Sequence, residues 1–287
     1  MFTMKRKIIS TASRLSACLV VSIGLCTRTA TAQTITLSAR SIQPGEIVRV
    51  EVQGPAELEG VAASVFGRRI PLEFDRERQV WNTLVGIDLD TKPGLYRMTI
   101  GTQVRLLRVI EKKFEVRRLR VAEEFVNPPA SAMEQIARDN KKTAEIYVRV
   151  TPRRWSGSFL LPVDGAPTSN FGTVSYFNGQ RRSPHTGVDF LSPTGTPVRA
   201  ANHGVVALAE PLYFTGNTVI VDYGDGLSSL FAHLSELRVK EGDEVQPETI
   251  VGLVGATGRV TGPHLHWAVH LHGARVDPTS LIYATKQ

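Results

Sequence analysis

Cysteine is scarce in this chain, and its scarcity excludes two kinds of site. The 287 residues include only two cysteines, Cys18 and Cys26, and both lie within the first 32 residues. Those 32 residues have the character of an export signal. If cleavage follows Ala32, the mature chain has no thiol, so neither a disulfide nor a zinc site with cysteine ligands is available.

Long apolar runs are missing as well. The extended run at residues 15–25 is shorter than the roughly 20 residues of a membrane-spanning helix, and no later stretch qualifies. Basic residues at 5–7 precede it, and Ala30-Thr31-Ala32 follows as a small-x-small cleavage site. This order is typical of a cleaved signal peptide over residues 1–32. We expect an exported protein of the periplasm or cell envelope, without a transmembrane segment after cleavage; an uncleaved N-terminal anchor is the alternative.

Lipidation is a second alternative for the N-terminus. Leu15-Ser16-Ala17-Cys18 resembles a lipoprotein processing box. Most of the apolar run follows Cys18, whereas such a box should end the run. Signal cleavage after Ala32 is therefore the preferred interpretation.

A strong net charge is absent from the mature chain. The whole sequence has 34 basic and 27 acidic residues, a formal net charge of +7. Residues 1–32 hold five of the basic and none of the acidic side chains, which leaves 29 basic against 27 acidic residues and a net charge of +2. So weak a field gives no reason to expect a nucleic-acid partner.

Residues 33–111 contain no histidine, and nothing in them indicates chemistry. Val48, Val50 and Val52 alternate with polar neighbours, as do the apolar residues of 96–100, which is the pattern of half-buried strands. Pro44-Gly45 and similar pairs mark turns between such strands. Short strands at this spacing predict a β-sandwich of immunoglobulin-like type. We interpret it as a spacer or as a surface that positions the next domain.

Residues 112–156 are predicted to be a linker that contains a helix. Charged residues run up to Asn127-Pro128-Pro129, and Ser131-Ala132-Met133-Glu134 has the form of a capping box. The helix is expected over about residues 132–147 and should end before Pro152.

The third part of the chain, residues 157–287, is rich in glycine, valine and turn dipeptides. Short β segments are expected at residues 198–209, 218–223, 227–232 and 264–271. They predict a mainly antiparallel β-sheet domain. The whole protein is therefore expected to be mainly β, with an N-terminal sandwich, a short helical linker and this C-terminal domain.

The sequence has no HExxH stretch, so it lacks the helix-borne glutamate base of other zinc proteases. Its C-terminal half instead holds His185-Thr-Gly-Val-Asp189, His233 within Phe-Ala-His-Leu-Ser, and His264-Leu-His266. Residues i, i+2 and i+4 of a strand share one face, so each evenly spaced motif can turn its side chains to one side. Zinc in hydrolytic sites takes three such ligands and leaves a fourth position open for water. Two histidines would remain to move protons.

Either motif alone is weak evidence, since a histidine in a sheet is more often a satisfied polar residue. Their joint occurrence favours a metal site. His264 and His266 would lie about 6.6 Å apart along a strand, so one can bind the ion while its neighbour faces the reaction zone. His270 would lie about 13 Å from His266, too far to share the ion. His203 and His272 are expected in turns.

The three histidine motifs resemble the signature of the lysostaphin-type (LytM-like) zinc metallopeptidases. The connecting segments that begin at Gly195, Gly216 and Val251 are similar as well, and the match covers roughly residues 157–282. One departure lies in residues 171–179, which are similar to the family's first loop. That segment carries Val174 and Ser175 where the family often has arginine.

The resemblance implies roles for five residues. It implies that His185, Asp189 and His266 bind Zn²⁺, and that His233 and His264 assist catalysis. It also implies a zinc metalloendopeptidase that hydrolyses the peptide crosslinks of peptidoglycan, with peptidoglycan and cell-envelope regulators as its partners. The N-terminal domain and linker are loosely similar to those of exported Gram-negative members.

Two other functions stay open from the sequence. Some proteins of this fold have lost ligands and act as non-hydrolytic cell-wall-binding regulators, but here the ligand set is complete. A metalloproteinase that acts on protein substrates is the second alternative, and nothing in the sequence excludes it. The sequence also leaves open which crosslink is cut and whether His233 or His264 is the base.

Overall fold

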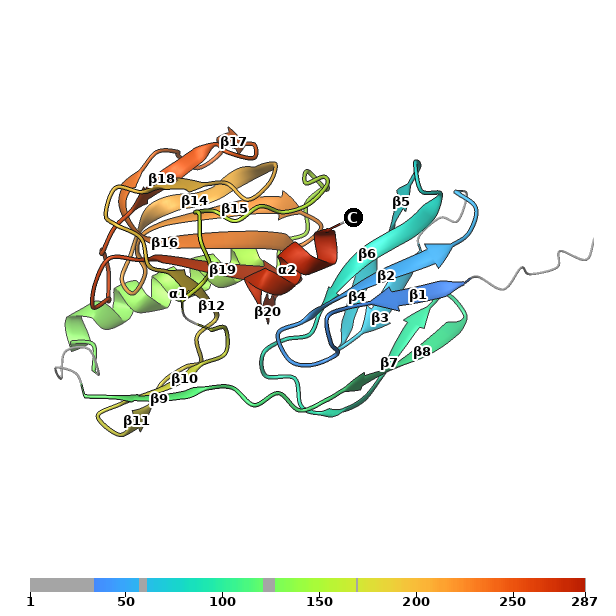
Figure 1. The fold of residues 1–287 in the computed structure, drawn as a ribbon, viewed down its shortest axis with the longest axis horizontal. Coiled ribbons are helices and arrows are strands. Elements are labelled where there is room, and N and C mark those ends of the chain that lie inside the picture. The colour runs from blue at the N-terminus through green and yellow to red at the C-terminus, as the bar shows by residue number, and fades with distance from the viewer. Residues whose placement is uncertain (1–33, 57–60, 121–126, 169, 287) are drawn as a thin grey trace, which may run out of the picture. The chain divides into compact units, whose positions relative to one another are not determined.

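Alternating apolar residues build the first two sheets of the chain. The computed structural model describes residues 34–56, 61–120, 127–168 and 170–286, so the signal peptide predicted at residues 1–32 lies outside the described residues. One antiparallel sheet has the strand order β1 (Ile35–Ser38), β2 (Ile47–Gln53), β6 (Val80–Gly86) and β5 (Glu73–Asp75). The other has the order β4 (Arg68–Pro71), β3 (Ala62–Val65), β7 (Gly94–Ile100) and β8 (Gln103–Val109) (Figure 1).

One apolar core joins these two sheets. Val48, Val50 and Val52 of β2 are fully buried, as are Met98 of β7 and Leu107 of β8. Apolar residues at every second position therefore face the other sheet, as the alternation predicts. The immunoglobulin-like type of this arrangement stays a prediction.

The described part of residues 112–156, the predicted linker, contains a strand, a 3₁₀ turn and a helix. Strand β9 (Val116–Leu119) pairs in parallel with β10 (Val174–Phe177), which pairs with β11 (Gln180–Arg181). A 3₁₀ turn, η2 (Ala130–Ala132), leads into α1 (Met133–Tyr147), so the predicted helix is confirmed. The predicted capping box is wrong, because Ser131 already lies inside the 3₁₀ turn, and no side chain caps the helix at Ala132.

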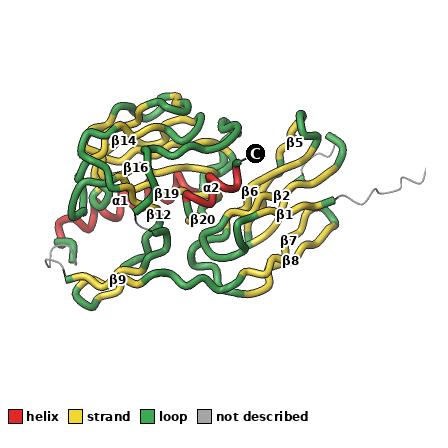
Figure 2. The backbone as a smooth tube through the Cα atoms, in the orientation of Figure 1, coloured by secondary structure: helices red, strands yellow, loops and turns green. Residues whose placement is uncertain are grey.

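The C-terminal domain is built on a nine-stranded sheet in which all pairs are antiparallel. Its main path has the order β12 (Gly187–Phe190), β19 (Leu265–Leu271), β16 (Leu227–Leu237), β15 (Gly216–Gly224), β14 (Gly204–Leu212) and β17 (Glu244–Val245). Three short strands pair beside this path: β13 (Pro197–Arg199), β18 (Ile250–Val254) and β20 (Ala274–Val276). The prediction of a mainly β protein is confirmed, and Figure 2 shows how little of the described chain is helical.

Helix α1 packs on this sheet. Ile146 near its C-terminal end lies in an apolar cluster with Leu208, Ile220 and Leu230 of β14, β15 and β16. The second helix, α2 (Pro278–Thr285), begins at Asp277, whose carboxylate accepts a hydrogen bond from the Thr279 backbone N–H. None of the described helices is long and apolar enough to cross a membrane.

An arginine–carboxylate contact joins the loop after β6 to strand β20. The Arg275 guanidinium donates to Asp88 Oδ1 at 2.6 Å and to Asp88 Oδ2 at 3.1 Å, and the Arg275 backbone N–H also donates to Oδ2 at 2.9 Å. Burial raises the pKa of Asp88, but the hydrogen bonds and charge of Arg275 outweigh this effect and hold that pKa below its usual value. The ionised carboxylate is thus favoured in the folded chain.

We expect Asp88→Ala to lower the free energy of unfolding at pH 7 by about 2 kcal/mol, because the carboxylate loses three hydrogen bonds from Arg275 and one from the Asp90 backbone N–H. The folded-state pKa of Asp88 is depressed, so its contribution is present above the unfolded pKa of about 4 and is lost as the pH falls. Urea denaturation at several pH values measures this.

Asp90→Ala is the matched control. Asp90 is more exposed and accepts a single hydrogen bond from Arg275 at 2.8 Å, so its loss should cost less than about 1 kcal/mol. Equal effects of the two substitutions would contradict the assignment.

Candidate metal centre

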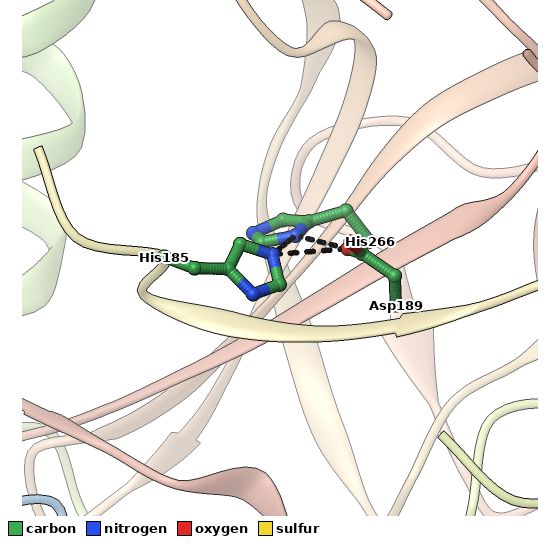
Figure 3. A group of neighbouring side chains, drawn as sticks. All are labelled: His185, Asp189 and His266. Atoms are coloured by element: carbon green, nitrogen blue, oxygen red, sulfur yellow. Dashed lines mark hydrogen bonds and ion pairs between the residues drawn. The ribbon is translucent and has the colours of Figure 1, made fainter. Parts of the chain in front are cut away.

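Two antiparallel strands bring the first two candidate ligands together. In the register of β12 with β19, Asp189 stands directly opposite His266. Directly paired residues project to the same face of a sheet, with Cβ atoms only about 5 Å apart. His185 reaches the same point from the loop that precedes β12 (Figure 3).

The three side chains converge on one small space. His185 Nε2 lies 3.0 Å from Asp189 Oδ1 and 2.9 Å from His266 Nδ1, and His266 Nδ1 lies 2.9 Å from the same Oδ1. All three predicted metal ligands therefore form one cluster, with one donor atom from each residue. Figure 3 shows both imidazole rings directed at the carboxylate.

The hydrogen bond on the far side of the His185 ring decides which nitrogen faces the cluster. His185 Nδ1 lies 3.2 Å from the backbone oxygen of Asn170. A carbonyl only accepts, so Nδ1 carries the proton in the neutral ring and Nε2 presents a lone pair. An outer partner of this kind is typical of metal-binding histidines.

This set of atoms fits a metal ion. His185 Nε2, Asp189 Oδ1 and His266 Nδ1 make three close contacts with one another. Because His185 Nε2 is unprotonated and the carboxylate only accepts, His266 Nδ1 has the one N–H available among these three atoms. A cation at the centre would satisfy all three. Two imidazoles and one carboxylate suit zinc, and bonds of about 2.0–2.1 Å in tetrahedral geometry place donors about 3.3 Å apart, close to the spacing found here.

The ionisation of the cluster suits a cation as well. Burial raises the pKa of Asp189, but its close contacts with the His185 and His266 rings outweigh burial and hold that pKa far below its ordinary value. Burial lowers the pKa of His266. An ionised carboxylate beside neutral imidazoles is the state in which these residues bind a metal.

Gly187 allows β12 to approach β19 closely. A Cβ atom at Gly187 would overlap the backbone oxygen of Trp267 and would lie 2.8 Å from His266 Cε1. Any side chain here would push the two strands apart at the point where Asp189 meets His266. The Thr-Gly-Val spacing between His185 and Asp189 is thus a packing requirement as well as a ligand spacing.

The other two predicted site residues lie beside the cluster. The ring centroids of His233 and His264 are 4.8 Å apart, and those of His233 and His266 are 6.0 Å apart. His264 Nε2 lies 3.9 Å from Asp189 Oδ1. The structure therefore brings together all five residues that the sequence singles out.

A bulge in β16 positions His233. The pairing of β15 with β16 shifts register between Asn217 and Val219, opposite Leu234 and Phe231, so β16 holds one extra residue there. His233 has a left-handed backbone, with φ of 64°. Bulges are common next to active sites because they redirect a side chain.

Both of these rings have the same tautomer as His185. His233 Nδ1 lies 2.9 Å from the backbone oxygen of Thr257, and His264 Nδ1 lies 2.9 Å from that of Gly262. In the neutral rings Nδ1 donates and Nε2 holds the lone pair. Burial lowers the pKa of His233 to about 3, aided by the nearby His266, so the ring is neutral at neutral pH.

The comparisons with known proteins agree with this site. The family model described as Peptidase family M23 matches residues 183–278. A crystal structure from Pseudomonas aeruginosa, named as a peptidase M23, is 33% identical to this chain, with 86% of this chain and 97% of that chain covered and a TM-score of 0.67. The chain belongs to peptidase family M23. The resemblance to lysostaphin-type metallopeptidases is thereby confirmed.

Curated relatives of this M23 chain match over a shorter span. DD-carboxypeptidase/endopeptidase Mpg of Neisseria meningitidis is 41% identical over 103 residues, which are 36% of this chain and 24% of the relative. Peptidoglycan DD-endopeptidase ShyA of Vibrio cholerae is 41% identical over 98 residues, which are 34% of this chain and 23% of the relative. The chain thus spans about a quarter of the length of these relatives.

The remaining histidines lie outside the cluster, as predicted for them. His270 is buried on β19 and stacks on Tyr147 of α1, with ring centroids 3.5 Å apart and planes 6° apart. Burial lowers its pKa to about 3, which keeps the stacked ring neutral. His203 and His272 lie in turns, at the start of β14 and after β19.

Sequence reasoning missed the backbone groups that orient the rings. The carbonyl oxygens of Asn170, Thr257 and Gly262 select the tautomers of His185, His233 and His264. No residue-type signal could reveal them, because every residue has such an oxygen. At the departure in the first loop, the backbone N–H of Arg182 donates to Ser175 O at 2.8 Å. Arg182, just after β11, is therefore the backbone neighbour of Ser175 on β10.

We expect Gly187→Ala to weaken zinc binding by at least tenfold, because the added methyl group separates Asp189 from His266. Competition with a chromophoric chelator measures the affinity. Gly94→Ala is the control, since Gly94 also lies in a strand, is likewise outside the left-handed φ region, and a Cβ atom there would meet only Tyr96 Cε2, at 3.8 Å. Equal zinc affinity in the two variants would show that the close approach is not needed.

Proposed function

We propose that this protein is an exported, zinc-dependent endopeptidase that hydrolyses peptide crosslinks of peptidoglycan. The observation that carries the proposal is the convergence of the cluster His185, Asp189 and His266 with two further histidines. Membership of family M23 supports it, as do the endopeptidase activities for which the relatives Mpg and ShyA are named. Such a substrate places the mature protein in the periplasm or cell envelope.

In this proposal His185, Asp189 and His266 hold the ion. Zinc, when bound, acts as a Lewis acid that acidifies water and polarises the scissile carbonyl. The carbonyl of Asn170 keeps the His185 ring in place, and the ladder of β12 with β19 fixes Asp189 and His266. These residues thus bring a rigid set of three donors to the reaction.

His233 and His264 move protons and orient the substrate. Each has its Nδ1 proton engaged by a backbone carbonyl, which leaves Nε2 ready to accept a proton from the attacking water. Once protonated, Nε2 can donate to the oxygen of the tetrahedral intermediate. A ring that has accepted a proton at Nε2 then returns it to the leaving amine. Proton transfer of this kind contributes about 10²–10⁴-fold to the rate.

The proposal extends to the organisation of the mature chain. Residues 33–111 form the immunoglobulin-like domain, 112–156 the linker with its helix, and 157–287 the metallopeptidase domain. A non-hydrolytic cell-wall-binding regulator is the second candidate, and the completeness of the five-residue set argues against it. A proteinase acting on proteins differs only in substrate, so a substrate panel separates it.

We expect His233→Ala to keep one zinc per chain while its turnover of purified sacculi falls about 10²–10⁴-fold, because a proton-transfer group is lost. Metal analysis and chromatography of the released fragments measure the two properties. His203→Ala, in a turn outside the cluster, is the matched control and should keep full activity.

His266→Ala should lose zinc and activity together, because one of three ligands is gone. A His233→Ala chain with wild-type turnover would remove His233 from the mechanism. A wild-type, zinc-loaded chain that releases no fragment from sacculi yet binds them would favour the regulator instead.

A further inference from the structure

The residues between the two domains contact the metal centre indirectly. Residues 112–119, here called the bracing segment, include β9, which pairs in parallel with β10. The backbone N–H of Val174 donates to Glu115 O at 2.8 Å. The Asn170 side-chain amide also donates to Glu115 Oε1 at 3.1 Å. The segment is thus bonded to the loop that precedes His185 at two separate points.

Aromatic packing adds a third point of contact. Gly172 has φ of 84°, and a Cβ atom there would overlap the ring of Phe114. The rings of Phe114 and Phe171 meet edge-on with centroids 6.4 Å apart, and Lys112 Nζ lies 5.3 Å from the first centroid and 5.9 Å from the second. Phe114 therefore rests on the backbone of the loop, where only glycine leaves room for it.

The loop residues that the bracing segment touches are those that hold His185. The backbone N–H of Gly172 donates to His185 O at 2.7 Å, and the His185 N–H donates to Thr173 O at 3.0 Å. His185 Nδ1 donates to Asn170 O at 3.2 Å. Asn170 and Gly172 thus each have one contact to the bracing segment and one to His185.

We propose that the bracing segment is a positioning element for His185, with Phe114 and Glu115 as its positioning residues. They hold residues 170–173 in the form in which the Asn170 carbonyl directs Nε2 of His185 toward Asp189. The inference rests on the proposed function, in which His185 is a zinc ligand. The linker is then part of the metal centre and more than a connection between domains.

The expected sizes follow from the nature of each contact. Loss of an outer partner of a metal ligand typically weakens metal binding 10–100-fold. Glu115 is exposed and its bond to Asn170 is one of several contacts, so Glu115→Ala should weaken zinc binding about threefold. Phe114→Ala removes the ring that fills the space above Gly172 and should weaken it about tenfold.

The test uses the mature chain with its domains intact. Zinc affinity is measured by competition with a chromophoric chelator, and the melting temperature of the metal-free protein is measured beside it. Glu111→Ala, at an exposed glutamate just before the segment, is the matched control and should match the wild type. Glu115→Gln keeps an oxygen that can accept from Asn170 and should restore affinity. Excess zinc should restore turnover in both alanine variants, because the reacting groups are unchanged.

The outcomes separate this proposal from the one before it. Wild-type zinc affinity in both Phe114→Ala and Glu115→Ala would overturn the positioning role alone. A wild-type chain that binds no zinc would overturn the proposed function. If Phe114→Ala lowers the melting temperature of the metal-free chain, the result for Glu115 is used instead. Weaker zinc binding in Glu115→Ala that is restored in Glu115→Gln supports the positioning role. Unchanged zinc binding in Glu115→Ala refutes it.

Discussion

The register of two antiparallel strands is the constraint on which the site depends. Because β12 and β19 pair with Asp189 opposite His266, two donors are fixed by a backbone ladder rather than by side-chain packing. A slip of one residue would turn both side chains to the other face of the sheet. Gly187 protects this register, since its neighbour strand passes too close for any side chain. The third donor, His185, comes from a loop and therefore needs separate support.

The same kind of hydrogen bond orients three of the histidine rings at the site. In His185, His233 and His264 a backbone carbonyl accepts from Nδ1, so in the neutral ring Nε2 holds the lone pair. Burial adds to this effect by lowering the pKa of His233 to about 3. The centre thus gathers imidazole rings around one ionised carboxylate, Asp189. That combination attracts a cation and at the same time leaves groups able to take up protons.

Sequence patterns predicted the parts of the structure that depend on side-chain type. Strand β2 follows from its alternating valines. Helix α1 ends before Pro152 as expected, although the capping box predicted at its start does not form. The single segment expected at 198–209 is two strands, β13 and β14, because the buried Asn202 amide bonds to Ser156 O and accepts from the His203 N–H. A local bond of this kind competes with the strand ladder, and the apolar pattern does not show it.

The five site residues were predictable because each carries distinctive chemistry at a distinctive spacing. The backbone elements that hold these residues in place could not be predicted. The pairing of β9 with β10 joins residues far apart in the chain, and parallel pairing leaves no local signature. The bulge at His233 cannot be predicted from the sequence either, since it adds one residue to the strand without requiring a particular residue type. The elements that support the site residues therefore depend on long-range backbone geometry, which residue type alone does not reveal.

The left-handed backbone of His233 has a consequence for how this protein tolerates change. A residue with a Cβ atom at φ of 64° costs on the order of 1 kcal/mol relative to glycine. Replacement of this histidine by glycine or asparagine would relieve that strain while removing the side chain that chemistry requires. Stability alone would therefore favour another residue at this position, so the histidine is explained by the chemistry of its side chain and not by its backbone.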